Sequence, residues 1–352
     1  MTARQLDERM VDYAVYGGAV LGGGGGGWIE DGLKLGRLAL EIGQPALVPA
    51  DRFADDALFV TVSMVGAPAA KEQYVKPVHY AKALELLGAR IGRPIEALHT
   101  NENGAGTTVN GWFQSALTGI PLVDFACNGR AHPTGSMGSL NLSEQDGYVS
   151  HQAAVGGRGS RYVEMSLSSS LGLAGSLVRQ ASVEAGGLVA VARNPVSASY
   201  ARENGAVGAI TRAMEVGEVL LSRKGEAAID AVASELGGKV AACGTVTAFG
   251  LETKGGFDVG TVTIDGKHEL TFWNEYMTLE LEGRRLATFP DLIMTLDADT
   301  ARPVITAAVE KGQRLAVLTV PREKLLLSTT MTNSKLLEPI EGIIGKSILE
   351  RE

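Results

Sequence analysis

One short segment of the chain, residues 121–133, concentrates side chains that could do chemistry. Its reactive and polar side chains are Asp124, Cys127, Asn128, Arg130 and His132. A cysteine acts as a nucleophile when nearby cations favour its thiolate, and a histidine can carry protons near neutral pH. An arginine can hold a substrate carboxylate through two parallel hydrogen bonds. The segment therefore predicts a catalytic cluster, and the alternative is that Cys127 is a small buried hydrophobe at a strand end.

A second polar segment, Asn101–Gly104, follows an apolar stretch that resembles a strand. Ligands bind at the carboxyl ends of strands in α/β sheets. Glu102 is therefore a candidate acid or base, and Asn103 a candidate substrate contact. Asparagine and glutamate also form turns and helix caps, which is the structural alternative for this segment.

Glycine makes up 45 of the 352 residues, and the run Gly22–Gly27 is unbroken. Six consecutive glycines satisfy the dinucleotide-binding pattern G-x-G-x-x-G trivially. Asp51 stands at about the distance from the run at which that pattern has an acidic residue for the ribose. A glycine run is costly to order, so a ligand or surrounding backbone must hold it. We favour a backbone wall of an active-site cleft, in which N–H groups of Gly24, Gly25 and Gly26 meet the substrate. A phosphate-binding turn and a flexible surface loop are the alternatives.

Other catalytic patterns are weak. The histidines, cysteines and acids show none of the spacings typical of metal sites, such as H-x-x-H, H-x-H or C-x-x-C. The serine-hydrolase motif G-x-S-x-G does not occur. We expect neither a metal nor a cofactor, and a metal-assisted hydrolase stays open as an alternative.

The composition narrows the partners. Lysine and arginine number 32 against 40 acids, which gives a net charge of −8, and aromatic residues are 5% of the chain. Both values argue against nucleic acid as a partner. No stretch of about 18 apolar residues predicts a membrane span, and the N-terminus does not resemble a signal peptide. With two cysteines and no disulfide scaffold, we expect a cytoplasmic protein that binds a small molecule. The sequence leaves a homo-oligomer open.

The elements that would position these residues change in character along the chain. In the first half, Ala57–Val65 predicts a buried strand, and Ala46–Val48 and Leu122–Phe125 predict shorter ones. Helical patterns lie between them, at Leu35–Ile42, His79–Leu87 and Thr107–Leu117. A further strand is expected to lead into the glycine run from Tyr13, with a helix after Trp28. Interleaved strands and helices predict an α/β domain with a mostly parallel sheet at 1–165.

The second half, 166–352, predicts a domain that contains a β-rich module at about 238–290. It follows a helix at Glu226–Leu236. The predicted strands of the module are Lys239–Ala248, Val259–Ile264, Glu269–Trp273 and Met277–Leu281. Asp265-Gly266 between two alternating strands is a strong hairpin signal. A strand at Asp291–Leu296, a helix at Pro303–Lys311 and a strand at Leu315–Val320 are expected after the module.

The order of several motifs resembles the S-methyl thiohydantoin desulfurase family, a hydantoinase-like family formerly of unknown function. The motifs are the glycine-rich loop, Glu102-Asn103-Gly104, Asp124…Gly129-Arg130-Ala131-x-Pro133, Gly255-Gly256-Phe257, Asn274-Glu275 and Pro290-Asp291-Leu292-Ile293. The resemblance covers nearly the whole chain. It implies two domains and a bacterial role in the catabolism of ergothioneine-type compounds. It also implies an enzyme that converts an S-methylated thiohydantoin to a hydantoin and releases methanethiol.

The chain departs from the pattern of that family at the reactive segment. The family pattern is Asp-x-Asp-x-x-Gly-Arg-Ala-x-Pro, in which the second Asp is Ala126 here, followed by Cys127. The variable position before Pro133, often aromatic, is His132. A carboxylate is therefore replaced, and a thiol and an imidazole are gained, which suits thiol chemistry.

These residues suggest one mechanism with alternatives. Cys127 would attack the ring carbon C2, His132 or Glu102 would move protons, and methanethiol would leave. Asp124 would orient the base, while Arg130 would bind an anionic substrate group, with Asn103 and Asn128 as further contacts. Activation of water by a carboxylate is the alternative to Cys127. A metal-assisted hydantoinase and a non-enzymatic nucleotide- or metabolite-binding subunit are the alternative functions.

Overall fold

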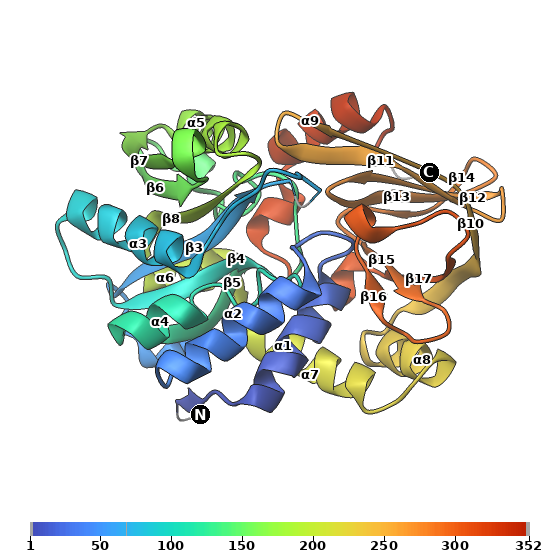
Figure 1. The fold of residues 1–352 in the computed structure, drawn as a ribbon, viewed down its shortest axis with the longest axis horizontal. Helices are drawn as coiled ribbons and strands as arrows, with labels where there is room; N and C mark the ends of the chain where they lie inside the picture. Colours follow the sequence, from blue (N-terminus) through green and yellow to red (C-terminus); the bar gives the residue numbers. More distant parts are fainter. Residues whose placement is uncertain (1–2, 68, 350–352) are drawn as a thin grey trace.

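The computed structural model describes residues 3–67 and 69–349. Two β-sheets lie side by side, the first flanked by most of the helices and the second formed by the C-terminal part of the chain (Figure 1). Among the described residues, no helix has both the length and the apolar character needed to cross a bilayer.

The first sheet has parallel strands at its centre. The order of its nine described strands is β1 (Arg4–Gln5), β2 (Ala46–Pro49), β5 (Leu122–Asn128), β4 (Ala97–Glu102), β3 (Leu58–Gly66), β8 (Leu188–Ser197), β6 (Ser150–Gly156) and β7 (Val163–Ser169), with β9 (Ala206–Val207) paired to β5. β2, β5, β4 and β3 are parallel, and antiparallel strands complete both sides. The predicted α/β class with its parallel sheet is confirmed. The predicted domain limit at residue 165 falls inside this sheet, because β7 spans it and β8 and β9 follow it.

Helices cover both faces of the first sheet. They are α1 (Glu8–Leu21), α2 (Ile29–Ile42), α3 (Pro77–Ile91), α4 (Trp112–Thr118), α5 (Leu171–Glu184), α6 (Ala198–Asn204) and α7 (Ala209–Leu221). Alternating side chains of β3 serve the two faces: Val60 and Val62 pack with α1–α4, whereas Phe59 packs with α6. α3 continues past the predicted stop at Gly88 and ends at Gly92, whose φ of 65° suits glycine.

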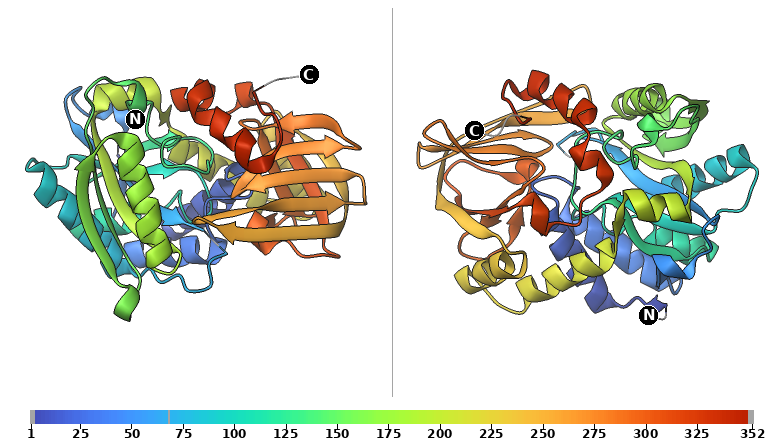
Figure 2. Two further views of the ribbon diagram at one scale, coloured as in Figure 1. Left: turned by 90° about the horizontal axis from the view of Figure 1, so that it is seen from above. Right: turned by 180° about the vertical axis from the view of Figure 1, so that it is seen from behind.

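The second sheet is antiparallel throughout its described strands. Their order is β14 (Arg284–Thr288), β13 (Glu275–Leu281), β12 (His268–Trp273), β11 (Phe257–Ile264), β10 (Lys239–Lys254), β17 (Arg314–Val320), β15 (Leu292–Asp297) and β16 (Pro303–Val304). The Asp265-Gly266 hairpin forms as predicted, with φ of 51° and 68° at its two residues. α8 (Glu226–Glu235) packs on β10 and β17, and α9 (Ser334–Ile344) packs on β12 (Figure 2). The β-rich module therefore extends beyond residue 290 to β17.

Two sequence predictions of local structure are wrong. The segment before the glycine run forms helix α1, whose N-terminus is capped by Asp7, since the Asp7 side chain accepts a hydrogen bond from Met10 N at 2.8 Å. Val11, Ala14 and Val15 follow helical spacing and are buried. The predicted helix at 303–311 is instead β16 followed by a 3₁₀ turn at Thr306–Ala308.

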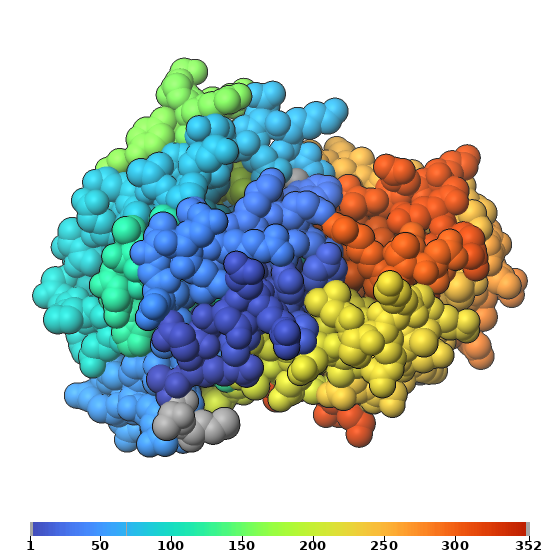
Figure 3. Space-filling model, turned by 60° about the horizontal axis from the view of Figure 1, so that its bottom comes forward, coloured from blue at the N-terminus to red at the C-terminus, as the bar shows by residue number. Residues whose placement is uncertain are grey.

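The two halves of the chain meet where α1 crosses α7. In Figure 3 the blue N-terminal helices border the yellow segment that contains α7 and α8. Glycines allow the close approach of α1 and α7: a Cβ on Gly17 would lie 1.8 Å from Ala213 O, and one on Gly217 would lie 1.9 Å from Tyr13 O. These backbones therefore touch with no room for a methyl group.

We predict that Gly217→Ala lowers the free energy of unfolding by about 1–3 kcal/mol, because the added methyl forces α1 and α7 apart. Chemical denaturation measures this change. Gly175→Ala on α5 is the matched control, since a Cβ there meets nothing within 4 Å; we expect it to be neutral or to stabilise by up to about 1 kcal/mol. Equal stability of both variants would contradict the tight crossing.

Candidate active site

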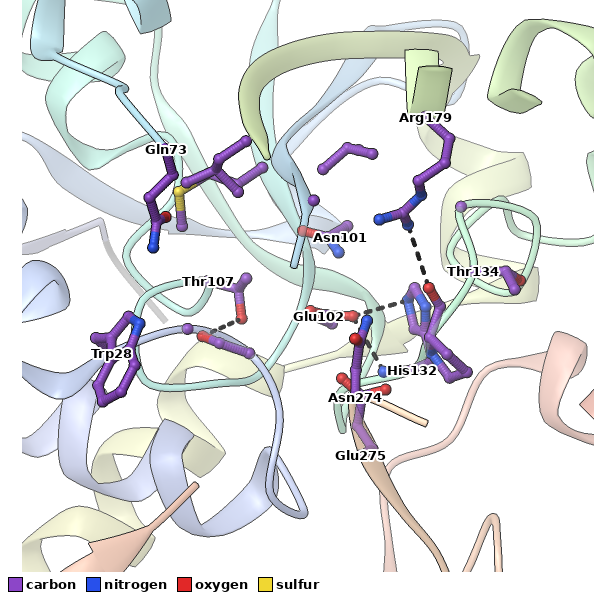
Figure 4. Close-up of a pocket in the computed structure, with 18 of the residues that line it drawn as sticks. Trp28, Gln73, Asn101, Glu102, Thr107, His132, Thr134, Arg179, Asn274 and Glu275 are labelled. Atoms are coloured by element: carbon purple, nitrogen blue, oxygen red, sulfur yellow. Dashed lines mark hydrogen bonds and ion pairs between the residues drawn. The ribbon is translucent and has the colours of Figure 1, made fainter. Parts of the chain in front are cut away.

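A cavity opens where the carboxyl end of β4 faces the second sheet (Figure 4). Its lining comes from the end of the glycine run, the ends of β3 and β4, the turn after β5, α5, β8 and the β12–β13 connection. The polar and charged lining residues are Asp31, Gln73, Asn101, Glu102, Thr107, His132, Thr134, Arg179, Arg193, Asn274 and Glu275. The cavity therefore brings together side chains that are far apart in the sequence.

Glu102 and His132 form the centre of the cavity. Glu102 is the last residue of β4, and His132 lies in the turn that follows the neighbouring strand β5. His132 Nε2 is 3.2 Å from Glu102 Oε2, and the backbone N–H of His132 donates to the same oxygen at 3.1 Å. A Cβ on Gly138 would lie 2.5 Å from Cε1 of the His132 ring. The absence of a side chain at Gly138 therefore makes room for the ring.

Burial sets the protonation of this pair. Desolvation raises the pKa of Glu102 to about 7, against the opposing effects of the His132 N–H and of Arg193. Desolvation lowers the pKa of His132 to about 3, and nearby Arg193 lowers it further. At neutral pH the imidazole is therefore neutral, while Glu102 exchanges its proton near pH 7. A carboxylate of this kind can act as a general base.

Two arginines, the partly buried Arg179 and the buried Arg193, supply positive charge to the same cavity. Arg179 donates to Gly256 O at 2.8 Å and to Pro133 O at 3.3 Å, and its guanidinium lies 4.0 Å from the centre of the Phe257 ring. Arg193, in β8, is 2% exposed, and its Nε has no hydrogen-bond partner. Within the described residues, neither guanidinium forms an ion pair. Glu102 attracts both guanidinium groups at longer range, and Glu275 also attracts Arg179. Guanidinium groups without a direct ion pair remain available to an anionic ligand group.

The glycine run is held by backbone on both sides. Gly26 O accepts hydrogen bonds from Gly106 N at 2.8 Å and from Thr107 N at 3.1 Å. Gly26 and Gly27 line the cavity. Gly24 and Gly25 instead contact the second sheet: a Cβ on Gly24 would lie 2.9 Å from the Tyr276 ring. The run follows a helix rather than a strand, so the dinucleotide fingerprint lacks its structural context.

Several predicted site residues lie outside this cavity. Cys127 is fully buried, with its Sγ 3.4 Å from Thr61 Oγ1 and 3.8 Å from His99 Nδ1. Desolvation raises the pKa of its thiol to about 12, which disfavours the nucleophilic thiolate. Asp124 accepts hydrogen bonds from Ile210 N and Thr211 N, and so caps α7 instead of orienting a base.

The remaining predicted contacts have structural partners as well. Arg130 donates to the carbonyls of Pro290 and Asp291 and lies 4.6 Å from the centre of the Phe289 ring, so it ties β5 to the second sheet. The Asn103 amide donates to Gly129 O and Ala209 O. The Asn128 amide donates to Arg130 O and accepts from Ser328 N. The predicted cluster thus divides: Glu102, His132 and Gly26 reach the cavity, and the others support its walls.

Four charged residues of the cavity, Asp31, Arg179, Arg193 and Glu275, are not among the predicted site residues, although Glu275 belongs to one of the family motifs. Arg193 interrupts the apolar strand Leu188–Ser197, and a cation in such a run is itself a signal of function. Glu275 stands beside Asn274 between two alternating strands, which reads as an ordinary turn. Arg179 lies on a helix without any distinguishing pattern.

The comparisons with known proteins define the family. A model described as the S-Me-THD-like N-terminal domain matches residues 9–166, and one described as the S-Me-THD-like C-terminal domain matches residues 170–335. The chain therefore belongs to the S-Me-THD-like family, as its ordered motifs suggested. A crystal structure of a protein from Chromobacterium violaceum is similar over 97% of this chain and 96% of that chain, with a TM-score of 0.73 and 20% identity. At that identity the likeness concerns the fold. No curated protein matches the chain.

We predict that Cys127→Ala keeps the turnover of the wild type, because the thiol lies outside the cavity. The variant should lose about 1 kcal/mol of stability, the usual effect of removing a small buried group. Turnover and melting temperature measured on the same preparation separate the two effects. A loss of turnover without a loss of stability would restore Cys127 as the nucleophile.

Proposed function

We propose that this protein hydrolyses the C–S bond of an S-methyl thiohydantoin, which yields a hydantoin and methanethiol. Membership of the S-Me-THD-like family supports the substrate class. The observation that carries the chemistry is the buried pair of Glu102 and His132, 3.2 Å apart at the centre of the cavity. Water activated by this pair, rather than Cys127, is the nucleophile.

The reaction begins with the ionised Glu102 removing a proton from water, whose oxygen bonds to the ring carbon C2. The electron pair of the C2=N bond moves to the ring nitrogen, which gains a proton. The tetrahedral intermediate then expels methanethiolate, and the proton held by Glu102 leaves with the sulfur. Loss of the hydroxyl proton forms the C2=O bond, so substrate plus water equals hydantoin plus methanethiol.

The other cavity groups bind and orient in this proposal. The backbone N–H of His132 holds Oε2 of Glu102 in place, and the neutral ring of His132 lies 3.2 Å from the same oxygen. Arg193 and Arg179 favour a substrate that carries an anionic substituent, because neither guanidinium is in a direct ion pair with a carboxylate among the described residues. The backbone of Gly26 and Gly27 forms a wall without side chains, against which a flat ring fits.

The decisive assay incubates the purified protein with S-methylated and unmethylated thiohydantoins and measures methanethiol and sulfide. We expect methanethiol from the methylated ring. A carboxylate-bearing substituent should lower KM relative to its neutral amide, since it neutralises the buried arginines. Ring-opened product would indicate the cyclic-amide hydrolase alternative. Nucleotide binding without turnover would indicate a binding subunit.

Glu102→Gln tests the base. We predict a loss in kcat/KM on the order of 10²–10⁴-fold, the usual contribution of a positioned base. Because the ionised carboxylate is the active form, the wild-type rate should rise as pH increases through about 7. The variant should lack that rise. Glu144→Gln is the control, since Glu144 pairs with Lys335 outside the cavity. A wild-type rate that is independent of pH from about 5 to 8 would argue against Glu102.

A further inference from the structure

Glu275 brings a second carboxyl into the cavity from the opposite sheet. It is the first residue of β13 and is 2% exposed, and its Oε2 is buried with no hydrogen-bond partner in the described structure. Its Oε1 lies against the glycine run, where a Cβ on Gly25 would be only 1.9 Å away. Glycine at this position therefore lets the carboxyl enter the cavity.

The charges around Glu275 come from four elements. Glu102, at the end of β4, repels its ionised form, whereas Arg130 after β5 and Arg179 on α5 attract it; its own backbone N–H also favours it. Burial and the Glu102 charge outweigh these attractions, so the pKa of Glu275 lies well above its usual value. Two buried carboxyls in one cavity do not both ionise easily, and a proton stays on one of them.

We propose that Glu275 is the general acid of this site, so that each sheet contributes one carboxyl to an acid–base pair. This inference rests on the proposed function and assigns the proton donor that the reaction requires. Figure 4 shows Glu102, Glu275 and Asn274 together at the centre of the cavity, with Trp28 and Gln73 on one side and Arg179 on the other. A flat ring between the two carboxyls would meet the base on one side and the acid on the other.

The proton transfers balance around one cycle. Glu275 gives its proton to the ring nitrogen as water adds to C2, and the nitrogen accepts the electron pair of the C2=N bond. Glu102 takes the proton of the water and later gives it to the departing methanethiolate. As the C2=O bond forms, the hydroxyl proton of the intermediate returns to Glu275. Both carboxyls end as they began, and no further reactant is consumed.

Glu275→Gln tests this assignment, because glutamine keeps the shape of the side chain and cannot give up a proton as an acid. We expect kcat for methanethiol release to fall on the order of 10²–10⁴-fold. The wild-type rate should decline once the pH exceeds the raised pKa of Glu275, and the variant should lose that decline. Glu275→Asp, which keeps an acid on a shorter side chain, should retain it.

Glu280→Gln is the matched control, because Glu280 lies on the same strand and pairs with Arg285 and Lys346 outside the cavity. It should keep the wild-type rate and pH profile. A Glu275→Gln variant that folds and turns over within a few-fold of the wild type would overturn the assignment.

Infrared spectroscopy separates this inference from the proposed reaction, since it needs no substrate. As the pH rises above about 7, Glu102 loses its proton. The wild type should then keep the carbonyl band of a buried, protonated carboxyl, and Glu275→Gln should lack it. Absence of the band in the wild type would overturn the role of Glu275 even if methanethiol is released. A band without methanethiol release would support the protonated Glu275 and contradict the proposed reaction.

Discussion

The site depends on the glycine run Gly22–Gly27, which backbone hydrogen bonds hold between the two sheets. Gly23 O accepts a hydrogen bond from Tyr276 N at 2.8 Å and Gly24 O accepts one from Thr306 N at 2.9 Å, both from the second-sheet region. Two residues further on, Gly26 O accepts hydrogen bonds from the loop after β4. One short segment therefore connects the sheets through backbone alone. A Cβ at any position from Gly22 to Gly26 would lie within 3.0 Å of a neighbouring atom, and Gly27 has a φ of 87° that favours glycine.

The pKa values of the cavity side chains follow from the burial that this packing produces. Because the sheets and the run bury these side chains, desolvation is the largest cause of the pKa changes at Glu102, His132 and Glu275. An open cleft would leave the carboxyls ionised and the imidazole near its usual pKa. The same burial makes the unpaired Arg193 costly, a cost that a ligand anion would offset. In the proposed reaction, the protonation of the two carboxyls and the preference for an anionic substrate therefore both depend on how the two sheets pack together.

The sequence was sufficient for local features and insufficient for long-range ones. The continuous apolar run Ala57–Val65 predicted β3, and Asp265-Gly266 predicted its hairpin, because both depend on neighbours in the chain. Strand alternation also bears on the reactive segment: Asp124 and Cys127 are three residues apart in β5, so their side chains point to opposite faces. Arg179, Arg193 and Glu275 join Glu102 only through tertiary packing, which no spacing encodes. A dinucleotide fingerprint requires a strand before its glycines, so that pattern predicted a strand from Tyr13. The segment forms α1 instead.

The three departures from the family pattern lie in different parts of the structure, and one of them lines the cavity. Ala126, where the pattern has a second Asp, packs against Ala206 and Ala209 on the side of the sheet that faces α7. A carboxylate at this position would lie near the helix that Asp124 already caps, away from the cavity. Cys127, the next residue, points to the opposite face among aromatic side chains. His132 is the one departure that enters the cavity, where it contacts Glu102 directly. In the proposed reaction, the departure that bears on the chemistry is therefore His132 beside Glu102, because neither Ala126 nor Cys127 lines the cavity.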